Sequence, residues 1–282
     1  MQIRQIAVLG AGTMGHGIAH AAIAGGYRTR LYDVSDAAIQ KGTAAIDAII
    51  RKGVDLGKVP ASEADAMRAR LTTTIRLEEA LDGVDFIIEA APEKLDLKLA
   101  LLADVDRLAP ESAIVATNTS ALSITEMAGS MKRPSRVAGM HFFNPVHRMK
   151  LIEIVQALES APETLQAIED VSRQMGKETV LVRESPGFIT SRVNASIGNE
   201  AFYMLMEGVA SARDIDKALK LGLNHPMGPF ELVDLVGLDT RLSILEYLHK
   251  TLGEKYRPCP LLRQYVAAGR LGRKVGRGVY DY

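Results

Sequence analysis

The sequence is poor in cysteine and carries no excess of either charge. Cys259 is its only cysteine, which excludes an intrachain disulfide and any metal site built from several thiolates. Lysine and arginine together number 34, as do aspartate and glutamate, so no global field would attract nucleic acid or a membrane surface. We therefore expect neither partner. We also expect no metal ion, because no acidic cluster with ligand spacing is evident.

Long hydrophobic runs are missing as well. The first apolar segment, Ile6–Leu9, ends at a glycine and is much shorter than a signal peptide or a membrane span. A cytoplasmic protein is the simplest expectation. Hydrophobic residues nonetheless make up 47% of the chain, which is ample for sizeable cores, and 282 residues suit two domains.

Short strand-like segments alternate with helical ones, such as Leu95–Leu108 and Glu163–Met175, over the first two-thirds of the chain. The predicted buried strands are Ile6–Leu9, Thr29–Asp33, Val84–Glu89, Ala113–Thr117, Val137–His141, Leu151–Val155 and Thr179–Val182. This alternation is typical of the α/β class. It predicts a Rossmann-like domain over residues 1–184, with a doubly wound, mostly parallel sheet covered by helices on both faces.

The pattern changes near Ser185, and residues 185–282 are predicted to form an all-helical domain. Apolar residues recur at every fourth position over Ile189–Leu205, which indicates a helix. A capping-box pattern opens a second helix over Ser211–Gly222. A third helix is predicted over Asp239–Gly253. No strand-like run of any length follows.

A glycine-rich loop, "GAGTMG", directly follows the first predicted strand and opens an alanine-rich helix. Gly10 permits the tight turn, Gly12 lets the backbone approach a pyrophosphate, and Gly15 lets the helix pack closely on the strand. The N–H groups at the start of the helix, around Thr13 and Met14, are available to the phosphates. The loop therefore predicts a dinucleotide site.

An acidic residue at the expected distance supports this prediction. Asp33 lies 18 residues after Gly15, at the end of the next strand, where a carboxylate binds the ribose hydroxyls and repels a 2′-phosphate. Arg28 and Arg30 come before the acid, so neither obviously replaces it as a phosphate clamp. The sequence predicts NAD rather than NADP. The alternative is a turn-forming glycine cluster with a strand-capping aspartate.

His141 is the candidate catalytic base. It ends a predicted strand, at the edge where open α/β sheets bind ligands, and the histidine pKa suits removal of a hydroxyl proton during hydride transfer. Asn144-Pro145 then turns the chain, so that Glu153 could return beside His141, fix its tautomer and stabilise the imidazolium. A purely structural His–Glu pair is an equally open alternative from spacing alone. His147 lies in the turn, where we expect a solvated side chain.

A second polar cluster, "TNTS", ends another predicted strand. Asn118, Thr119 and Ser120 should open onto the same crevice as His141, where Ser120 could hydrogen-bond the reacting oxygen. Alternatively, these residues only cap a helix that starts near Ser123. The sequence alone does not decide between the two.

Seven motifs occur in order along the whole chain: "GAGTMGHGIA", "IIEAAPEKLDLK", "TNTSALSI", "GMHFFNPVHRMKLIEIV", "ESPGFITSR", "LNHPMGPFELVDLVGLD" and "LGRKVGRGVYDY". Together they resemble the short-chain L-3-hydroxyacyl-CoA dehydrogenases, especially the bacterial 3-hydroxybutyryl-CoA dehydrogenases. The resemblance implies reversible, NAD-dependent oxidation of an (S)-3-hydroxyacyl-CoA to the 3-ketoacyl-CoA, with 3-hydroxybutyryl-CoA as the expected substrate and acetoacetyl-CoA as the product. It also implies a homodimer formed through the helical domain.

The resemblance assigns roles to individual residues. His141 matches the family's catalytic base, Glu153 its orienting carboxylate, and Ser120 the hydroxyl that contacts the substrate oxygen. Asn144 matches an amide near the substrate and the nicotinamide. The cofactor-side positions of the family are matched by Glu93, Lys98 and Lys274.

The basic stretch after the second predicted strand matches the region where the family binds CoA. Arg51, Lys52 and Lys58 could meet the 3′-phosphate by charge, and Lys58 is the best positional match. Arg51 falls where a serine is usual. A solvated basic face is the alternative for each of these residues.

One position departs from the family pattern. Ser191 stands where an asparagine usually helps to bind the substrate, and a hydroxyl presents one donor instead of the two N–H groups of an amide. We expect Ser191 to keep a weaker contact with the substrate, or Asn194, one helical turn later, to supply the amide.

Two other functions remain open. The chain could oxidise a free hydroxy acid, with the same base and no CoA groove. It could also be a non-catalytic NAD-binding protein. The complete set of His141, Glu153, Ser120 and Asn144 favours an enzyme.

Overall fold

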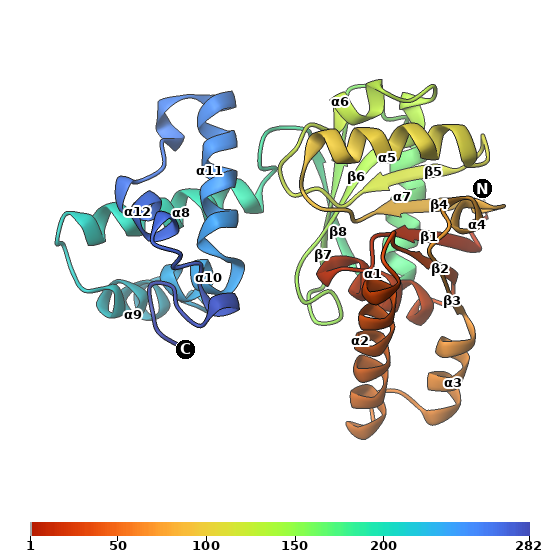
Figure 1. Cartoon of the computed structure of the whole chain (residues 1–282), viewed down its shortest axis with the longest axis horizontal. Helices are drawn as coiled ribbons and strands as arrows, with labels where there is room; N and C mark the ends of the chain where they lie inside the picture. Colours follow the sequence, from red (N-terminus) through yellow and green to blue (C-terminus); the bar gives the residue numbers. More distant parts are fainter. Residues whose placement is uncertain (1) are drawn as a thin grey trace. The chain divides into compact units, whose positions relative to one another are not determined.

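The computed structural model describes residues 2–282, and the chain divides into two compact units, Met1–Glu184 and Ser185–Tyr282 (Figure 1). The first unit is built on a β-sheet and the second is helical. Within Gln2–Tyr282, no helix combines the length and the apolar character that crossing a bilayer would take.

Eight strands of the described chain form one sheet in the order β3-β2-β1-β4-β5-β6-β7-β8. They are β1 (Gln5–Leu9), β2 (Arg28–Tyr32), β3 (Leu71–Thr74), β4 (Phe86–Glu89), β5 (Ile114–Thr117), β6 (Val137–Phe142), β7 (Leu151–Gln156) and β8 (Glu178–Arg183). Every neighbouring pair is parallel except β6 and β7, which pair antiparallel. The strand order reverses between β1 and β4, which is the point where such sheets bind ligands.

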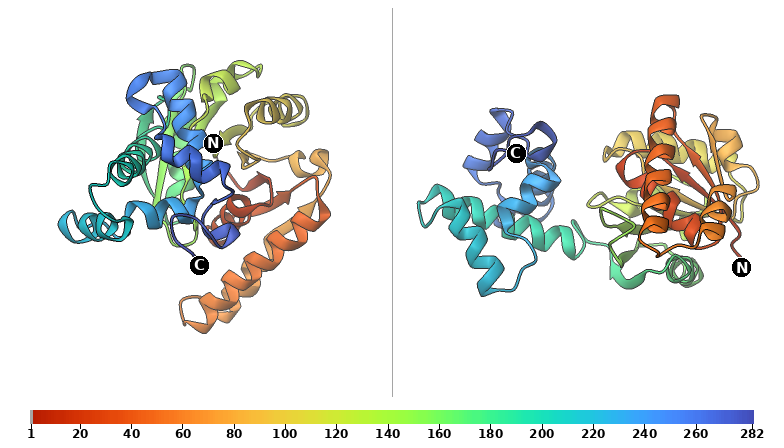
Figure 2. Two further views of the ribbon diagram at one scale, coloured as in Figure 1. Left: turned by 60° about the vertical axis from the view of Figure 1, so that its left-hand side comes forward. Right: turned by 90° about the horizontal axis from the view of Figure 1, so that it is seen from below.

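Helices cover both faces of this sheet (Figures 1 and 2). They are α1 (Thr13–Ala24), α2 (Asp36–Asp55), α3 (Ala61–Ala69), α4 (Leu77–Leu81), α5 (Leu95–Leu108), α6 (Ile124–Gly129) and α7 (Pro162–Gln174). Helices α1, α2, α3 and α7 contribute to one apolar core. The inner strands read as continuous apolar runs because helices bury them on both sides. The predicted α/β class and the mostly parallel sheet are confirmed.

The two edge strands differ from the sequence prediction. Thr179–Val182 lies in β8 as predicted, but this strand is not buried, and the side chain of Leu181 is 62% exposed. The apolar run could not reveal this, because an edge strand and an inner strand share the same composition. The opposite edge strand, β3, was missed because its sequence, "LTTT", lacks an apolar run.

The second unit contains α8 (Thr190–Met206), α9 (Ala212–Gly222), α10 (Pro229–Val236), α11 (Leu238–Leu252) and α12 (Pro260–Ala267). The Ser211 hydroxyl caps α9 by accepting from the Asp214 N–H at 3.2 Å, as the capping pattern predicts. Extended structure among its described residues is limited to isolated bridges near the C-terminus. The predicted all-helical class of this unit is confirmed.

The buried face of α8 follows the apolar spacing of the sequence only in part, at Ala201, which is fully buried. Ile189 and Val193, which begin the predicted apolar stripe, are 50% and 52% exposed. The helix instead buries a neighbouring face that includes Ala195, Gly198 and Phe202. The small residues on that face allow close packing, and a pattern based on large apolar residues overlooks them.

Candidate active site

The glycine loop has the geometry that a dinucleotide requires. Gly10 adopts a positive φ of 111°, and a Cβ there would lie 2.6 Å from the carbonyl oxygen of Ala90. A Cβ on Gly15 would overlap the carbonyl oxygen of Gly10. Protein packing therefore accounts for both glycines. It does not account for Gly12, where a Cβ would meet nothing within 4 Å, and this open position fits the close approach of a pyrophosphate to the loop and to the start of α1 at Thr13.

Asp33 lies directly after β2 and beside this loop. Its Oδ2 accepts from the Ala11 N–H at 2.9 Å, and its Oδ1 accepts from the Ser35 N–H at 3.0 Å. Each carboxylate oxygen can accept a second hydrogen bond, so these contacts orient the group and leave capacity for ribose hydroxyls. The Arg30 guanidinium donates to the carbonyl oxygens of Glu79 and Asp82. The residues present thus fit NAD.

His141 and Glu153 face each other across the β6–β7 hairpin. They are register partners, and the His141 Nδ1 lies 2.7 Å from the Glu153 Oε2. Glu153 is fully buried and His141 is 6% exposed. Because an ionised carboxylate only accepts, Nδ1 carries the proton of the neutral imidazole and the role of base falls to Nε2. His147 lies in the exposed loop between the strands, where partial burial and the Arg148 charge lower its pKa.

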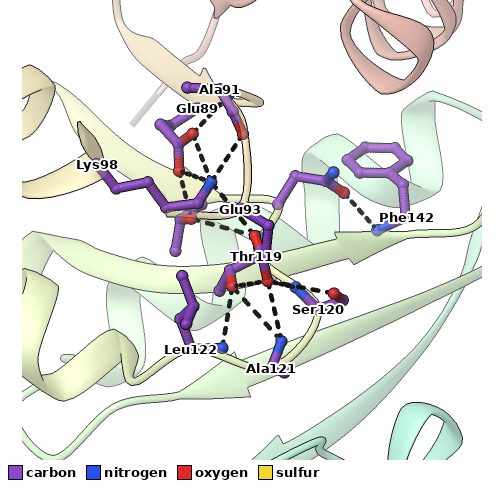
Figure 3. Close-up of polar contacts among 11 residues, drawn as sticks. Glu89, Ala91, Glu93, Lys98, Thr119, Ser120, Ala121, Leu122 and Phe142 are labelled. Atoms are coloured by element: carbon purple, nitrogen blue, oxygen red, sulfur yellow. Dashed lines mark hydrogen bonds and ion pairs between the residues drawn. The ribbon is translucent and has the colours of Figure 1, made fainter. Parts of the chain in front are cut away.

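Ser120 is held by Glu93 (Figure 3). One oxygen of this carboxylate, Oε1, accepts from the Ser120 N–H at 2.8 Å, the Ser120 hydroxyl at 3.2 Å and the Thr119 hydroxyl at 2.6 Å. Thr119 is fully buried, which corrects the expectation that it opens onto the crevice. The helix cap is Ser123, whose hydroxyl accepts from the Glu126 N–H at the start of α6. The strand-end cluster is therefore not the cap of that helix.

Lys98 lies behind this loop, not on its surface. Its side chain is 1% exposed, and its ammonium donates to both oxygens of Glu89, at 2.7 and 2.9 Å, and to the Ala91 carbonyl oxygen at 3.1 Å (Figure 3). Three acceptors satisfy all three donors of an ammonium. Any influence of Lys98 on a bound cofactor would therefore pass through Glu89 and the loop that carries Glu93.

Glu89 and the structural contact of Asn118 were not predicted from the sequence. The Asn118 side-chain oxygen accepts from the Phe142 N–H at 2.9 Å, which ties the end of β5 to the residue after His141. Asn144 follows in the exposed loop. A clue to Glu89 was present, since a carboxylate directly after the apolar run "FII" is unusual for a buried strand.

Other predicted residues lie away from this edge of the first unit or in the second unit. Arg51 and Lys58 are exposed near the C-terminal end of α2, which with α3 extends beyond the sheet (Figure 1). Ser191 is in the first turn of α8, followed by the exposed Asn194. The Lys274 ammonium lies 2.7 and 2.6 Å from the carboxylate oxygens of Asp239 within the second unit.

The described residues offer no group of three or more histidine, cysteine, aspartate or glutamate side chains placed to hold a metal ion. A wide hollow of about 1400 Å³ lies at the amino ends of the strands, on the opposite edge of the sheet from His141. It is lined by residues of both charges, including Arg4, Arg28 and Asp170, and by none of the predicted site residues. This hollow is therefore separate from the edge of the sheet that carries His141 and Ser120.

Comparison with known proteins identifies the family of both units. Residues 5–185 match the NAD-binding domain of 3-hydroxyacyl-CoA dehydrogenases, and residues 187–282 match the C-terminal domain of the same family. The chain is 46% identical to a probable 3-hydroxybutyryl-CoA dehydrogenase of Bacillus subtilis, over 100% of this chain and 98% of that protein. It is 41% identical to the 3-hydroxybutyryl-CoA dehydrogenase of Bradyrhizobium diazoefficiens, over 99% and 96% of the two chains.

A solved structure shares the whole fold. The (S)-3-hydroxybutyryl-CoA dehydrogenase of Ralstonia eutropha superposes with a TM-score of 0.96 at 43% identity, over 100% of this chain and 99% of that one. The two family models together span nearly all of the sequence, and the cofactor of the first domain is NAD. The chain belongs to the 3-hydroxyacyl-CoA dehydrogenase family.

Proposed function

We propose that the chain oxidises (S)-3-hydroxybutyryl-CoA reversibly to acetoacetyl-CoA, with His141 as the general base. The observation that carries the proposal is the buried His141–Glu153 pair, 2.7 Å apart at the carboxyl edge of the sheet that also carries the glycine loop. The preference for a four-carbon acyl chain is supported by the similarity to the 3-hydroxybutyryl-CoA dehydrogenases of B. subtilis, B. diazoefficiens and R. eutropha.

The proton transfer follows from the hydrogen bonds. The glycine loop and Asp33 would hold NAD, which would supply the hydride acceptor for the carbon that bears the hydroxyl. His141 Nε2 takes the hydroxyl proton as that C–H bond breaks, and Glu153 stabilises the resulting imidazolium through the Nδ1–H. In the reverse direction, the imidazolium returns the proton to the carbonyl oxygen. Ser120, fixed by Glu93, is the group assigned to contact the reacting oxygen.

Substrate and cofactor contacts elsewhere are part of the same proposal. Lys58 and Arg51 would bind the CoA 3′-phosphate, and the exposure of both side chains is compatible with this. Ser191 would supply the substrate contact that an asparagine usually makes, with Asn194 as the alternative. Comparing the rates of Ser191→Asn and Asn194→Ala tests the choice.

The remaining assignments concern the cofactor and the second subunit. Asn144 and Lys274 would lie on the cofactor side of the site. We propose a homodimer formed through the helical unit, supported by the exposed apolar side chains of Ile189, which directly precedes α8, and of Val193 in its first turn. Light scattering that returns a monomer mass would rule the dimer out.

The function is tested by adding acetoacetyl-CoA to the protein with NADH, and in parallel with NADPH, and following the absorbance of the reduced nicotinamide. We expect rapid loss with NADH, and a fall in kcat of roughly 10² to 10⁴-fold for His141→Gln, since a general base contributes that much. His249→Gln is the matched control, because the His249 ring pairs with Glu254, which is not assigned to the site.

Two outcomes would point to the other functions. Equal rates with acetoacetate and acetoacetyl-CoA would indicate a dehydrogenase of free hydroxy acids, because a CoA-dependent enzyme uses the remote part of its substrate to raise the rate. No turnover of either compound by protein that binds NADH would indicate a non-catalytic NAD-binding protein.

A further inference from the structure

Glu89 is a fully buried carboxylate at the carboxyl end of β4. We propose that Glu89 and Lys98 form a positioning pair, which holds the ends of β4 and β5 so that Glu93 can fix Ser120. This inference rests on the proposed function, since it assigns the pair a role in the same reaction. Neither side chain would touch the substrate.

The Glu89 carboxylate joins three separate segments of the chain. It accepts from the Lys98 ammonium of α5, from the Thr117 hydroxyl at 2.6 Å and from the Ala91 N–H at 2.6 Å. Thr117 is the last residue of β5, and Ala91 lies in the loop after β4. One buried charge therefore fixes the loop that carries Glu93 and the loop that carries Ser120.

The connection continues to Ser120 through Glu93. The Lys98 Nζ lies 3.6 Å from the Glu93 Oε2, while the Glu93 Oε1 accepts the Ser120 hydroxyl proton at 3.2 Å (Figure 3). Ser120 has a single hydroxyl proton, which points at Glu93 here, so this proton has to turn from Glu93 to the reacting oxygen when Ser120 binds the substrate. The pair thus controls where Ser120 lies and, through Glu93, which way its hydroxyl points.

Stability alone gives a poor account of this pair. Taking two charges out of water costs several kcal/mol per ion, and replacing a buried pair by neutral residues of similar volume is often neutral or stabilising. The other residues of β4, Phe86, Ile87 and Ile88, are fully buried apolar side chains. Charge appears in this strand only at its site end, where two loops must be held in one arrangement.

The test is the double variant Glu89→Gln/Lys98→Met, which removes both charges together. Single variants would leave one buried charge unpaired and could unfold the protein. We expect the double variant to fold, with a Tm near that of the parent, and to reduce acetoacetyl-CoA with kcat lowered roughly tenfold or more. The KM for acetoacetyl-CoA should change less than kcat, because positioning matters most in the transition state.

Repeating the double substitution in Ser120→Ala protein distinguishes a loss of Ser120 positioning from a general loss of activity. In Ser120→Ala protein the same double substitution should lower kcat by less than about twofold, because no hydroxyl remains to be positioned; such coupling is what a double-mutant cycle measures. The matched control is Glu63→Gln/Arg70→Met, which removes an ion pair of 2.7 Å near the amino end of β3. We expect this control to keep the parent kcat.

Each remaining outcome is decisive. A double variant that folds with kcat within twofold of the parent, or that loses the same factor in both backgrounds, would overturn the proposal. A double variant that does not fold would also overturn it, because the pair would then be needed for stability. If the parent itself fails to reduce acetoacetyl-CoA, the proposed function fails and this inference fails with it. If the parent is active, a failure of this inference can be distinguished from a failure of the proposed function.

Discussion

Both units of the molecule bury carboxylates, but for different purposes. In the first unit, Glu89 and Glu153 accept mainly from side chains that a reaction could use or that support such groups, among them Lys98 and His141. In the second unit, Asp216 and Asp234 accept from backbone N–H groups and tyrosine hydroxyls. The first arrangement holds side chains of the candidate site, whereas the second holds backbone, at the first turn of α10 for Asp216 and in the C-terminal tail for Asp234.

The C-terminal tail shows the second arrangement clearly. Asp234 accepts from the Val279 N–H at 2.8 Å, the Tyr280 N–H at 2.9 Å and the Tyr282 hydroxyl at 3.0 Å. A Cβ on Gly278 would overlap the Asp234 carboxylate. The tail has few ladder hydrogen bonds of its own, so a buried acid satisfies its backbone donors instead.

The comparison is tested most strongly by matched changes from acid to amide. Glu153→Gln should lower kcat by about 10²-fold or more, because an amide cannot stabilise the imidazolium of His141 as a carboxylate does. Its Tm should stay close to the parent value, since an amide oxygen can still accept from Nδ1–H. Steady-state kinetics and thermal melts check both expectations. An unchanged kcat in folded protein would make the pair a structural one.

Asp234→Asn should show the opposite behaviour. It replaces a charged acceptor of several hydrogen bonds by an amide, and the free energy of unfolding should fall by about 1.5–3 kcal/mol. We expect kcat to remain within twofold of the parent at a temperature where the variant is folded. Denaturant titration measures the first effect. A tenfold loss of kcat in folded Asp234→Asn would mean that the buried carboxylates of the two units do not differ in purpose.

The pH dependence of stability gives a further test of the comparison, through His20 in the first unit. Burial, with smaller contributions from the neighbouring charges of His147, Lys177 and His16, lowers the pKa of His20 from its ordinary 6.5 to about 4. The unfolded chain therefore binds more protons than the folded one between these values, and stability is lost as pH falls through this window. The parent's Tm should drop between pH 7 and pH 5 by about 2–4 °C more than that of His20→Gln.

His249→Gln is the control for this effect, because His249 belongs to the second unit and carries an exposed partner, Glu254. The Tm of His249→Gln should change with pH in the same way as the Tm of the parent. If His20→Gln also follows the parent, the charge of His20 has no part in acid destabilisation.

The sequence was sufficient for the features that local pattern controls. The two apolar strands around Asn144-Pro145 indicated that Glu153 could lie beside His141, and the spacing of the glycines indicated the glycine loop, whereas the register of β6 and β7 was not predicted. Burial of a strand depends instead on its neighbours in the sheet, so the exposure of Leu181 could not be predicted. The role of Glu89 could not be predicted for a similar reason: its partners Lys98 and Thr117 come from other elements, α5 and β5.

The smallest expected effect concerns Asp216. Acidification should stabilise the protein through Asp216, whereas it destabilises the protein through His20. Burial raises the pKa of this carboxyl above its ordinary 3.8, although hydrogen bonds from Phe230, Tyr280 and Glu231 act against the shift. In the window between the two values the folded chain binds more protons, so this group stabilises the second unit as pH falls.

The Tm gap between the parent and Asp216→Asn should therefore widen on acidification through this window, by less than about 2 °C. Only the change in the gap is informative, because the amide also weakens the hydrogen bonds from the Phe230 and Glu231 N–H groups at every pH. A gap that narrows as pH falls would mean that those hydrogen bonds outweigh burial. Asp216 would then favour its charged form, and the two units would respond to acid with the same sign.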